Sequence, residues 1–448
     1  MRWIRDGWQV CCRTAFREWY KTVRGRGRQM ETAVRKAEVI DTAVMGYGTI
    51  GSGVVEILER NRDEIINKTG KELRLKYVLD LRDFPGSPVE DKVVHDLAVI
   101  VDDPEVKIVV ETMGGVHPAY EFVRACLLAG KHVATSNKAL VAACGSELLK
   151  IAREKQVNFM FEASTGGGIP VIRTMYRCMN GEKIQEITGI LNGTTNYILT
   201  KMDRFGETFE TALKEAQDLG YAERNPEADV EGHDTCRKLA ILTAMATGKE
   251  VDYQDIPTEG ITAVTDVDFK YAERLGKSVK LLGSSRIAEG QVTAFVAPVM
   301  IGPENPLFSV NDVYNGIVIK GNMLGVTMLY GSGAGKLPTA SAVVADMIEA
   351  AQFINENIPL GWIEKKQPVE SLDQGVFRYF VRIGKDGEDA VRAAEAEMGP
   401  AEVVTLEEMP EFALLTEPMT EAEFNRKKAA LVKRLEDRSA VLQVIRAE

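Results

Sequence analysis

The sequence lacks the features that mark several broad classes of protein. No apolar run approaches the roughly 18 residues that a membrane-spanning helix needs, so no such helix is expected. Positive charge is not in excess, because 55 Lys and Arg residues stand against 66 Asp and Glu residues, and a general nucleic-acid-binding role is therefore not expected. Long repeats and low-complexity tracts are also missing. The 448 residues are enough for about two or three domains with substantial cores.

Cysteine is scarce and scattered. The chain has six cysteines, and none of them forms a Cys-x-x-Cys pair. No secretory signal is evident, so a disulfide framework is not expected. Reduced thiols in a cytoplasmic protein fit this pattern best.

The beginning of the chain differs in composition from the rest. Residues 1–29 are strongly basic and contain three of the four tryptophans. A targeting segment or a helix on a membrane surface would explain this composition. We favour the alternative that translation begins at Met30. Residues 1–37 are then a basic extension, and residues 1–29 are expected to be dispensable for folding and activity.

Strand and helix patterns alternate from residue 38 to residue 165. Such alternation is typical of a doubly wound parallel sheet of the Rossmann type. An amphipathic helix with small residues is predicted at 338–354, so residues 326–355 are expected to complete this domain. Residues 166–325, between the two pieces, alternate less regularly and are interpreted as a second, α+β domain.

The last part of the chain has a pattern of its own. Residues 356–373 have the composition of a linker. Residues 374–448 then follow the order strand, helix, strand, strand, helix, strand, which predicts a ferredoxin-like module. The fold class expected is therefore α/β, with a Rossmann-type domain, an α+β domain and a ferredoxin-like module.

A glycine-rich turn, "GYGTIG", lies between the first predicted strand and the first predicted helix. Gly46 allows the tight turn, Gly48 lets a pyrophosphate approach the backbone, and Gly51 permits close packing of helix on strand. In this position the pattern predicts dinucleotide binding rather than a glycine turn without a cofactor.

Charged residues stand at the carboxyl ends of the predicted strands, where a parallel sheet binds its ligands. Asp80 and Arg82 follow the second strand. They leave the choice between NAD and NADP open, because an acid favours the free ribose of NAD and an arginine favours the 2′-phosphate of NADP. Lys138, in "ATSNKALVA", follows a later strand, and we interpret it as a site residue rather than a surface lysine.

The stretch "FEASTGGGIP" (161–170) joins the first two predicted domains. Its three successive glycines expose backbone carbonyls and Glu162 adds a carboxylate, and hard cations prefer such oxygen ligands. From the spacing alone, a flexible hinge between domains is the favoured interpretation.

The stretch "EGHDTCRKL" (231–239) concentrates ionisable residues at the start of a predicted helix. Asp234 and Lys238 are four positions apart and therefore share one helix face. Further acids nearby make a plain surface ion pair a less convincing interpretation; they are Glu223, Asp229 and Glu231.

The same stretch contains a spacing that a metal would accept, between His233 and Cys236. No second cluster of Cys or His completes four ligands, so zinc is not expected. Cys236 is interpreted as a small apolar residue of the helix.

Taken together, these motifs resemble homoserine dehydrogenase. The resemblance rests on stretches that keep the family's order between about residue 41 and residue 350: "GYGTIGSGV", "MGGVHPAYEFVRACLLAGKHVATSNKALVA", "EASTGGGIPVI", "GILNGTTNYILTKM", "GYAERNPEADVEGHDTCRKLAIL" and "GSGAGKLPTASAVVADM". Other Rossmann dehydrogenases share the first motif but not this series. The resemblance implies reversible NAD(P)-dependent interconversion of L-homoserine and L-aspartate 4-semialdehyde, on the route to threonine, methionine and isoleucine. It also implies that residues 166–325 bind the substrate and dimerise, in a homodimer or homotetramer.

The resemblance further implies roles for single residues. Asp234 and Lys238 are similar to the family's acid and lysine at the substrate, and Lys138 to its lysine between nicotinamide and substrate. Either lysine is a candidate for the proton transfer. The residues implied in binding the substrate are Glu223, Asp229 and Lys138. The residues implied in binding NAD or NADP are Gly46, Tyr47, Gly48, Thr49, Ile50, Gly51, Arg82, Thr112, Met113, Asn137, Lys138 and Gly333. The residues implied in binding a monovalent cation, Na⁺ or K⁺, are Glu162, Thr165, Gly167 and Ile169.

The chain departs from the family at three places. Ser164, Thr165 and Gly166 stand where the family commonly has Ala-Val-Ala, although backbone ligands would preserve a cation site. His233 stands where a small or apolar residue is usual. The C-terminal module resembles the ACT regulatory domain of some members, but its first turn, "RIGKDGEDA", lacks the Pro-Gly pair of an amino-acid-binding turn. Packing between subunits is therefore expected of it, rather than feedback control by threonine.

Two other functions fit parts of the pattern. Another dinucleotide-dependent enzyme of small amino acids, such as a semialdehyde reductase, would carry the acids at 223–238 by chance. A non-catalytic NAD(P)-binding regulator would normally have lost one of three residues that this chain keeps, namely Lys138, Asp234 and Lys238.

Overall fold

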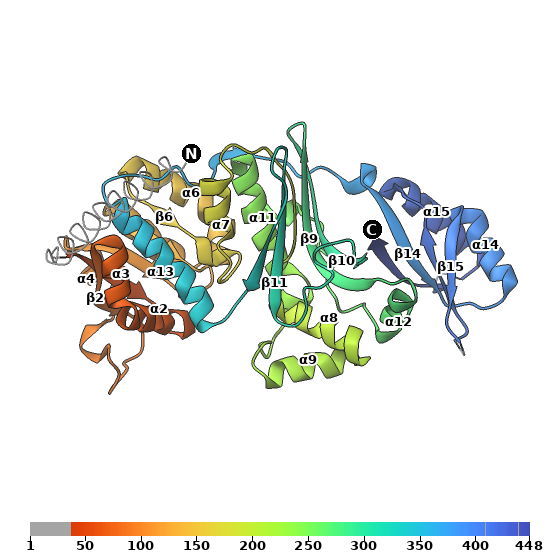
Figure 1. Cartoon of the computed structure of the whole chain (residues 1–448), viewed down its shortest axis with the longest axis horizontal. Coiled ribbons are helices and arrows are strands. Elements are labelled where there is room, and N and C mark those ends of the chain that lie inside the picture. The colour runs from red at the N-terminus through yellow and green to blue at the C-terminus, as the bar shows by residue number, and fades with distance from the viewer. Residues whose placement is uncertain (1–36, 408, 438) are drawn as a thin grey trace, which may run out of the picture.

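The computed structural model describes residues 37–407, 409–437 and 439–448. The basic extension predicted at the start of the chain therefore lies outside the described residues, apart from residue 37. The described chain forms three bodies in a row, with the first domain and the C-terminal module at opposite ends and the second domain between them (Figure 1). Within this part of the chain, no helix is both long enough and apolar enough to cross a bilayer.

The first domain is built on a six-stranded sheet whose paired strands are all parallel. Its strands, in the order 3-2-1-4-5-6 across the sheet, are β1 (Glu38–Met45), β2 (Lys71–Leu79), β3 (Val93–Val94), β4 (Val106–Glu111), β5 (His132–Thr135) and β6 (Phe159–Met160). Consecutive residues of β1 and β4 are buried, because helices cover both faces of the sheet. The order reverses between β1 and β4, which is the point where such a sheet binds ligands. The predicted doubly wound parallel sheet is confirmed.

Helices pack on this sheet from two separate parts of the chain. The first part supplies α2 (Thr49–Arg60), α3 (Arg62–Thr69), α4 (Ala98–Val101), α5 (Ala119–Leu128) and α6 (Lys138–Lys155). The second part supplies α13 (Lys336–Gln352), which lies against α2. A Cβ at Gly53 would lie 3.0 Å from Ala340 Cβ, so small residues on both helices allow the close approach that the sequence predicted.

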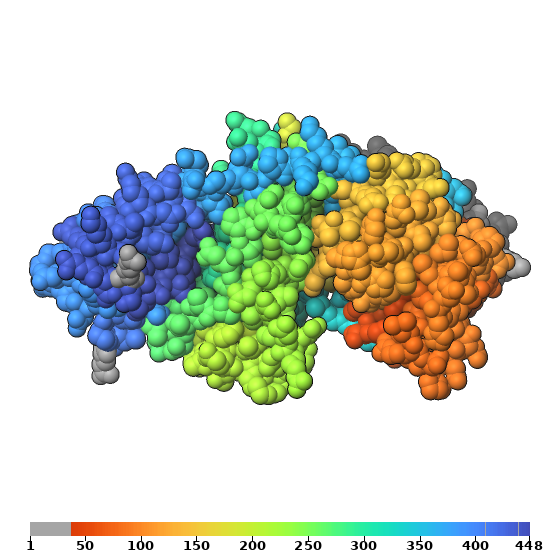
Figure 2. Space-filling model, turned by 180° about the vertical axis from the view of Figure 1, so that it is seen from behind, coloured from red at the N-terminus to blue at the C-terminus, as the bar shows by residue number. Residues whose placement is uncertain are grey.

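The second domain is an antiparallel sheet with helices on one face. Its strands β7 (Ile184–Ile190), β9 (Ser278–Ala288), β10 (Gln291–Ile301), β11 (Tyr314–Gly321) and β12 (Gly325–Ser332) pair antiparallel in the order 12-11-7-9-10. The longer helices are α8 (Gly193–Phe205), α9 (Phe209–Asp218), α11 (His233–Thr247) and α12 (Asp266–Arg274). A Cβ at Gly283 would lie 3.1 Å from Thr235 Cγ2, so α11 lies directly on this sheet. Seen from behind, the second domain contacts the first over most of their shared height, and the surface between them is hollowed at the lower side (Figure 2).

The C-terminal module follows the predicted strand and helix order. It consists of β14 (Val376–Ile383), α14 (Glu388–Met398), β15 (Ala401–Thr405), β16 (Phe412–Thr416), the short β17 (Met419–Thr420), α15 (Glu421–Arg434) and β18 (Val441–Ala447). The sheet order is 18-14-16-15 and its pairs are antiparallel. Strand β18 also pairs with β10 in parallel, which joins the module's sheet to that of the second domain. Arg382 Nη1 lies 2.5 Å from Asp268 Oδ1 and completes this junction with a buried ion pair.

The segment 356–373, which has the composition of a linker, is packed on both the first and the second domain. Its strand β13 (Ile363–Lys366) pairs with β8 (Lys249–Glu250), which follows α11. Its side chain Trp362 is buried and donates to Ser146 Oγ of α6 at 2.9 Å. A linker prediction from composition misses such packing, because one tryptophan can anchor an otherwise polar segment.

Candidate functional site

The glycine turn between β1 and α2 has the shape that a dinucleotide phosphate needs. Gly46 has φ +92°, a conformation that side chains other than glycine rarely adopt. A Cβ at Gly51 would overlap the carbonyl oxygen of Gly46, whereas a Cβ at Gly48 would meet nothing within 4 Å. The backbone at Gly48 is therefore approachable, and Thr49 and Ile50 begin the helix whose N-terminus favours an anion. These residues fit a pyrophosphate.

The end of β2 places an acid beside this turn. Asp80 Oδ2 accepts the Tyr47 amide at 2.8 Å, and Arg82 Nε donates to Asp80 Oδ1 at 3.0 Å. The hydrogen bond from Arg82, with that from the Tyr47 amide, lowers the pKa of Asp80 to about 2. The acid and the arginine that the sequence suggested for NAD and NADP thus pair with each other, beside the glycine turn.

A buried carboxylate that sequence reasoning missed organises the switch point of the sheet. Glu111 ends β4 and is fully buried. It accepts hydrogen bonds from Thr135 Oγ1 at 2.5 Å and from the Met113 amide at 2.7 Å. Burial raises the pKa of Glu111, although these hydrogen bonds act to lower it. An acid that ends an apolar strand, as in "VKIVVETMGG", is the signal that could have found it.

The other residues implied in cofactor binding, apart from Gly333, gather around the same edge. Thr112 Oγ1 donates to Gly46 O at 2.8 Å, and Met113 lies against Gly46. Asn137 caps the N-terminus of α6 and donates to Gly115 O at 2.6 Å. Gly333 precedes α13, and a Cβ there would overlap the side chain of Asn315.

One carboxylate of the second domain holds lysines from both domains. Lys138 begins α6 of the first domain, and its Nζ forms an ion pair with Asp234 Oδ1, in the first turn of α11. Lys238 Nζ lies 2.7 Å from Asp234 Oδ2. Asp234 is 2% exposed and Lys238 7%, whereas the side chain of Lys138 is 43% exposed. The predicted pair on one helix face is therefore joined by a third residue from the other domain.

Burial and charge separate the two lysines of this cluster. Burial opposes the ionised form of Asp234, but Lys238 and then Lys138 outweigh it and hold its pKa well below the usual range. Burial lowers the pKa of Lys238 despite Asp234. For Lys138 burial also acts to lower the pKa, but Asp234 outweighs it and the pKa is raised. Burial therefore opposes the charge of Lys238, whereas the ion pair with Asp234 preserves the charge of Lys138.

Asn192, which sequence reasoning also missed, connects Asp234 to Asp229, an acid that the resemblance implies in substrate binding. Its Nδ2 donates to Asp229 Oδ1 at 2.7 Å and to Asp234 Oδ2 at 2.8 Å. Its Oδ1 caps α8 by accepting the Thr195 amide. Burial, followed by the nearby charge of Asp234, raises the pKa of Asp229. The N-cap pattern in "LNGTT" predicts the helix start but not this second role.

The remaining predicted residues of this region form no side-chain hydrogen bond or ion pair with Asp234 or its two lysines. Glu223 is exposed, and its backbone carbonyl accepts from Gln217 Nε2 at 3.2 Å. His233 is exposed at the first position of α11. Cys236 is buried and its Sγ donates to Tyr253 O at 3.1 Å. Among the described residues, no group of three or more His, Cys, Asp or Glu is placed to hold a metal ion.

The carboxylate of Glu162 is engaged differently from the ion-binding role that the sequence suggested. Its two oxygens accept the Ile172 amide at 2.8 Å and the Arg173 amide at 2.7 Å. Its contribution to a cation site would therefore come from the backbone carbonyl. Thr165 Oγ1 is buried and has no hydrogen-bond partner among the described residues, and a Cβ at Gly167 would overlap Gly333 O. An oxygen without a partner in a tightly turned backbone fits a small hard cation.

Comparisons with known proteins identify the family of the chain. The family model described as "Homoserine dehydrogenase, NAD binding domain" matches residues 46–162, and the model "Homoserine dehydrogenase" matches residues 170–348. The chain is 39% identical to homoserine dehydrogenase of Bacillus subtilis over 72% of this chain and 75% of that one. The crystal structure of a homoserine dehydrogenase from Thiobacillus denitrificans matches with a TM-score of 0.83 and 34% identity, over 92% of this chain and 98% of that one. A hyperthermophilic archaeal homoserine dehydrogenase in complex with NADPH matches with a TM-score of 0.58 and 27% identity, over 70% of this chain and 98% of that one. The chain therefore belongs to the homoserine dehydrogenase family of NAD(P)-dependent oxidoreductases.

Proposed function

We propose that this enzyme interconverts L-homoserine and L-aspartate 4-semialdehyde with Asp234 and its two lysines as the proton-transfer site. The observation that carries this assignment is a buried carboxylate that binds ammonium groups from two domains. The ammonium from the first domain begins α6, at the carboxyl edge of the parallel sheet, where such sheets bind ligands. The reaction belongs to the route to threonine, methionine and isoleucine.

The chemistry divides between the cofactor and the chain. A bound nicotinamide supplies the hydride donor or acceptor, and the residues of this chain manage the proton and the charge. During reduction the aldehyde oxygen gains negative charge, which the Lys238 ammonium stabilises and then neutralises by giving a proton. Lys238 Nζ also donates to Leu191 O at 2.6 Å, so the carbonyl and Asp234 together fix its direction. During oxidation, neutral Lys238 accepts the hydroxyl proton.

We assign the proton transfer to Lys238 rather than to Lys138, because the pKa of Lys238 is lowered and that of Lys138 is raised. Lys138 keeps its charge and is more exposed, which suits a residue that orients the substrate between the domains. Asp229 is half-buried with Asn192 as its partner, so a substrate ammonium would supply the positive charge that it needs. Glu223, six residues before Asp229, is the second proposed ammonium ligand.

Two further ligands belong to this proposal. NADP and NAD both fit the turn, because Arg82 offers a cation for a 2′-phosphate and Asp80 an acceptor for a 2′-hydroxyl. A monovalent cation, Na⁺ or K⁺, is proposed at the turn after Glu162, with the backbone of Thr165, Gly167 and Ile169 as ligands. The partnerless Thr165 Oγ1 supports this assignment.

The reaction is tested directly with purified protein. At alkaline pH, L-homoserine is expected to drive reduction of NAD or NADP, and aspartate semialdehyde to drive reoxidation of the reduced cofactor near neutral pH. The measurement is the absorbance of the reduced nicotinamide in both directions. L-serine, which lacks one methylene, is the control substrate. Absence of turnover in both directions with both cofactors would overturn the proposal.

The C-terminal module is proposed to be an ACT-like unit that packs between subunits. Its first turn, between β14 and α14, has no Pro-Gly, and the buried Arg382–Asp268 pair fixes the module to the second domain. Added threonine is therefore expected to leave the initial rate of homoserine oxidation unchanged. The measurement is the rate across a threonine titration, with methionine as the matched amino acid. Strong inhibition by threonine alone would contradict this assignment.

Self-association and cytoplasmic location complete the proposal. Large apolar side chains are exposed together along the β11–β12 hairpin, which supports a homodimer or homotetramer. They are Tyr314, Met323, Leu324, Val326 and Tyr330. The cysteines that the structure describes are free, which supports a reducing compartment such as the cytoplasm.

A further inference from the structure

The proposed reaction depends on how the first two domains are held relative to each other. Lys138 belongs to the first domain, while Asp234 and Lys238 belong to the second. The chain passes between these domains at residues 162–173 and returns at residues 331–336. A small change in the angle at these crossings would separate Lys138 from Asp234.

A cluster of buried charges lies at the outgoing crossing. It comprises Glu162, at the end of the first domain's sheet, Arg173 of α7 (Val171–Arg173), and Asp346 and Glu349 of α13. Arg173 Nη2 lies 2.7 Å from Asp346 Oδ1, and Arg173 Nε lies 2.9 Å from Glu349 Oε2. The backbone amide of Glu162 donates to Asp346 Oδ2 at 2.9 Å. One arginine of the second domain therefore binds two carboxylates of a first-domain helix.

The same cluster closes the glycine turn between the domains. Because the carboxylate of Glu162 accepts the amides of Ile172 and Arg173, it joins the two ends of residues 163–171. This turn packs on the return crossing, where the Gly168 amide donates to Ser332 O at 3.0 Å. The contacts of Glu162, Arg173 and Gly168 thus connect the outgoing crossing both to α13 and to the return crossing.

Burial distinguishes this cluster from ordinary surface ion pairs. The side chains of Glu162 and Asp346 are 2% exposed, and that of Arg173 is 26% exposed. A buried ion pair contributes little net stability, but it fixes geometry because breaking it leaves an unpaired buried charge.

We propose that Arg173, with Asp346 and Glu162, is the clamp that fixes the angle between the first two domains and so holds Lys138 at Asp234. The three are positioning residues, since they touch neither the lysines nor the glycine turn of the cofactor. This inference rests on the proposed roles of Lys138 and Asp234. Its rival is the segment 356–373, whose Trp362 also connects α6 to the region of α11.

The test combines kinetics with a double-mutant cycle. Arg173→Lys keeps the charge but loses the two-pronged contact, and it is expected to lower kcat by about 10- to 100-fold, the cost of slight misplacement. The cofactor dissociation constant, measured by fluorescence, is expected to change less than kcat does, because the residues implied in cofactor binding, Gly333 excepted, lie within the first domain. In a Lys138→Ala background the same substitution is expected to cost less than about threefold, because the contact that it protects is already gone.

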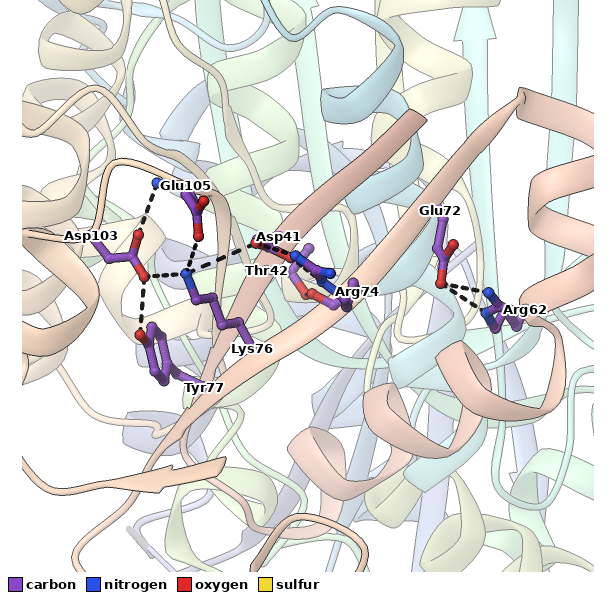
Figure 3. Close-up of polar contacts among 9 residues, drawn as sticks. All are labelled: Asp41, Thr42, Arg62, Glu72, Arg74, Lys76, Tyr77, Asp103 and Glu105. Carbon is purple, nitrogen blue, oxygen red and sulfur yellow. Dashed lines mark hydrogen bonds and ion pairs between the residues drawn. The ribbon is translucent and has the colours of Figure 1, made fainter. Parts of the chain in front are cut away.

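Arg74→Lys is the matched control. Arg74 binds Asp41 with two hydrogen bonds, of 2.6 and 2.8 Å, and both residues lie on strands of the first domain (Figure 3). Its loss is expected to lower the melting temperature without changing kcat or KM. Asp346→Asn serves as the second clamp variant if Arg173→Lys does not fold.

Amide hydrogen exchange gives a readout that does not depend on activity. Exchange at residues 163–171 and 331–336 is expected to become faster in Arg173→Lys and to stay unchanged in Arg74→Lys. If the wild-type protein did not turn over homoserine, the proposed function would be overturned. If amide exchange were unchanged in Arg173→Lys, the clamp proposal would be overturned. If Arg173→Lys lowered kcat equally with and without Lys138, the clamp proposal would likewise be overturned. The segment 356–373 would then be the contact that fixes the angle between the domains.

Discussion

Replacing Lys238 by alanine is expected to lower kcat by about 10²- to 10⁴-fold while cofactor affinity stays nearly unchanged. The Lys238 ammonium is the proposed proton donor, held by Asp234 and by the carbonyl of Leu191. Its removal takes away charge stabilisation that is needed mainly in the transition state. The protein should still fold, because Asp234 keeps Lys138 as an ion-pair partner. Steady-state kinetics in both directions and a fluorescence titration of the cofactor measure the two effects.

A control for this variant lies on the same helix. Cys236→Ala removes a buried thiol whose partner is the Tyr253 carbonyl, away from the lysines, and is expected to be mild. Near-normal kcat in Lys238→Ala, together with loss of activity in His233→Ala or Cys236→Ala, would assign the chemistry to the other two residues.

Replacing Asp234 by asparagine is expected to lower kcat by about 10²-fold or more and to shift the pH dependence of semialdehyde reduction. The Asp234 carboxylate raises the pKa of Lys238, which burial lowers. Without that charge the pKa of Lys238 falls further, so its proton is lost at lower pH. Reduction needs the ammonium, and its rate should therefore begin to decline at a lower pH than in the wild type. The measurement is kcat for reduction across a pH series.

Glu231→Gln is the control for the pH experiment. Glu231 is an acid three positions earlier whose carboxylate accepts from Thr262 Oγ1 at 3.1 Å, and neither lysine is its partner. Its pH profile should match the wild type. If the profile of Asp234→Asn also matched the wild type, then the group that limits reduction would not be a lysine held by Asp234.

The sequence predicted the parts of the fold that depend on local patterns. The parallel sheet, the glycine turn and the close packing of the helix at 338–354 follow from periodicity and small residues within short stretches. The pairing of Asp234 with Lys238 follows from a spacing of four on a helix. The family assignment, confirmed by the comparisons, came from the order of several such stretches.

Contacts between distant segments were not predictable in this way. Asn192 meets Asp229 and Asp234 from positions 37 and 42 residues away, and no short pattern encodes that meeting. The Glu162 carboxylate looked free beside three glycines, but its partners are the amides of Ile172 and Arg173. A polar residue's chemistry depends on its neighbours in space, which only the folded chain defines.

The placement of α13 has a consequence for how the enzyme folds. Lys336 of α13 binds Glu56 of α2, although the two residues are 280 positions apart in the chain. The whole second domain is therefore inserted within the first, and one face of the first domain's sheet lacks the cover of α13 until the inserted part of the chain has been made. The entropy cost of closing so long a loop grows only slowly, by about 0.6 kcal/mol for each doubling. Prior folding of the second domain would shorten the flexible part of the loop, so we expect the inserted domain to form before α13 closes on the first domain. Residues 38–165 expressed alone would lack this cover, and unfolding of the first domain is coupled to that of the domain within it.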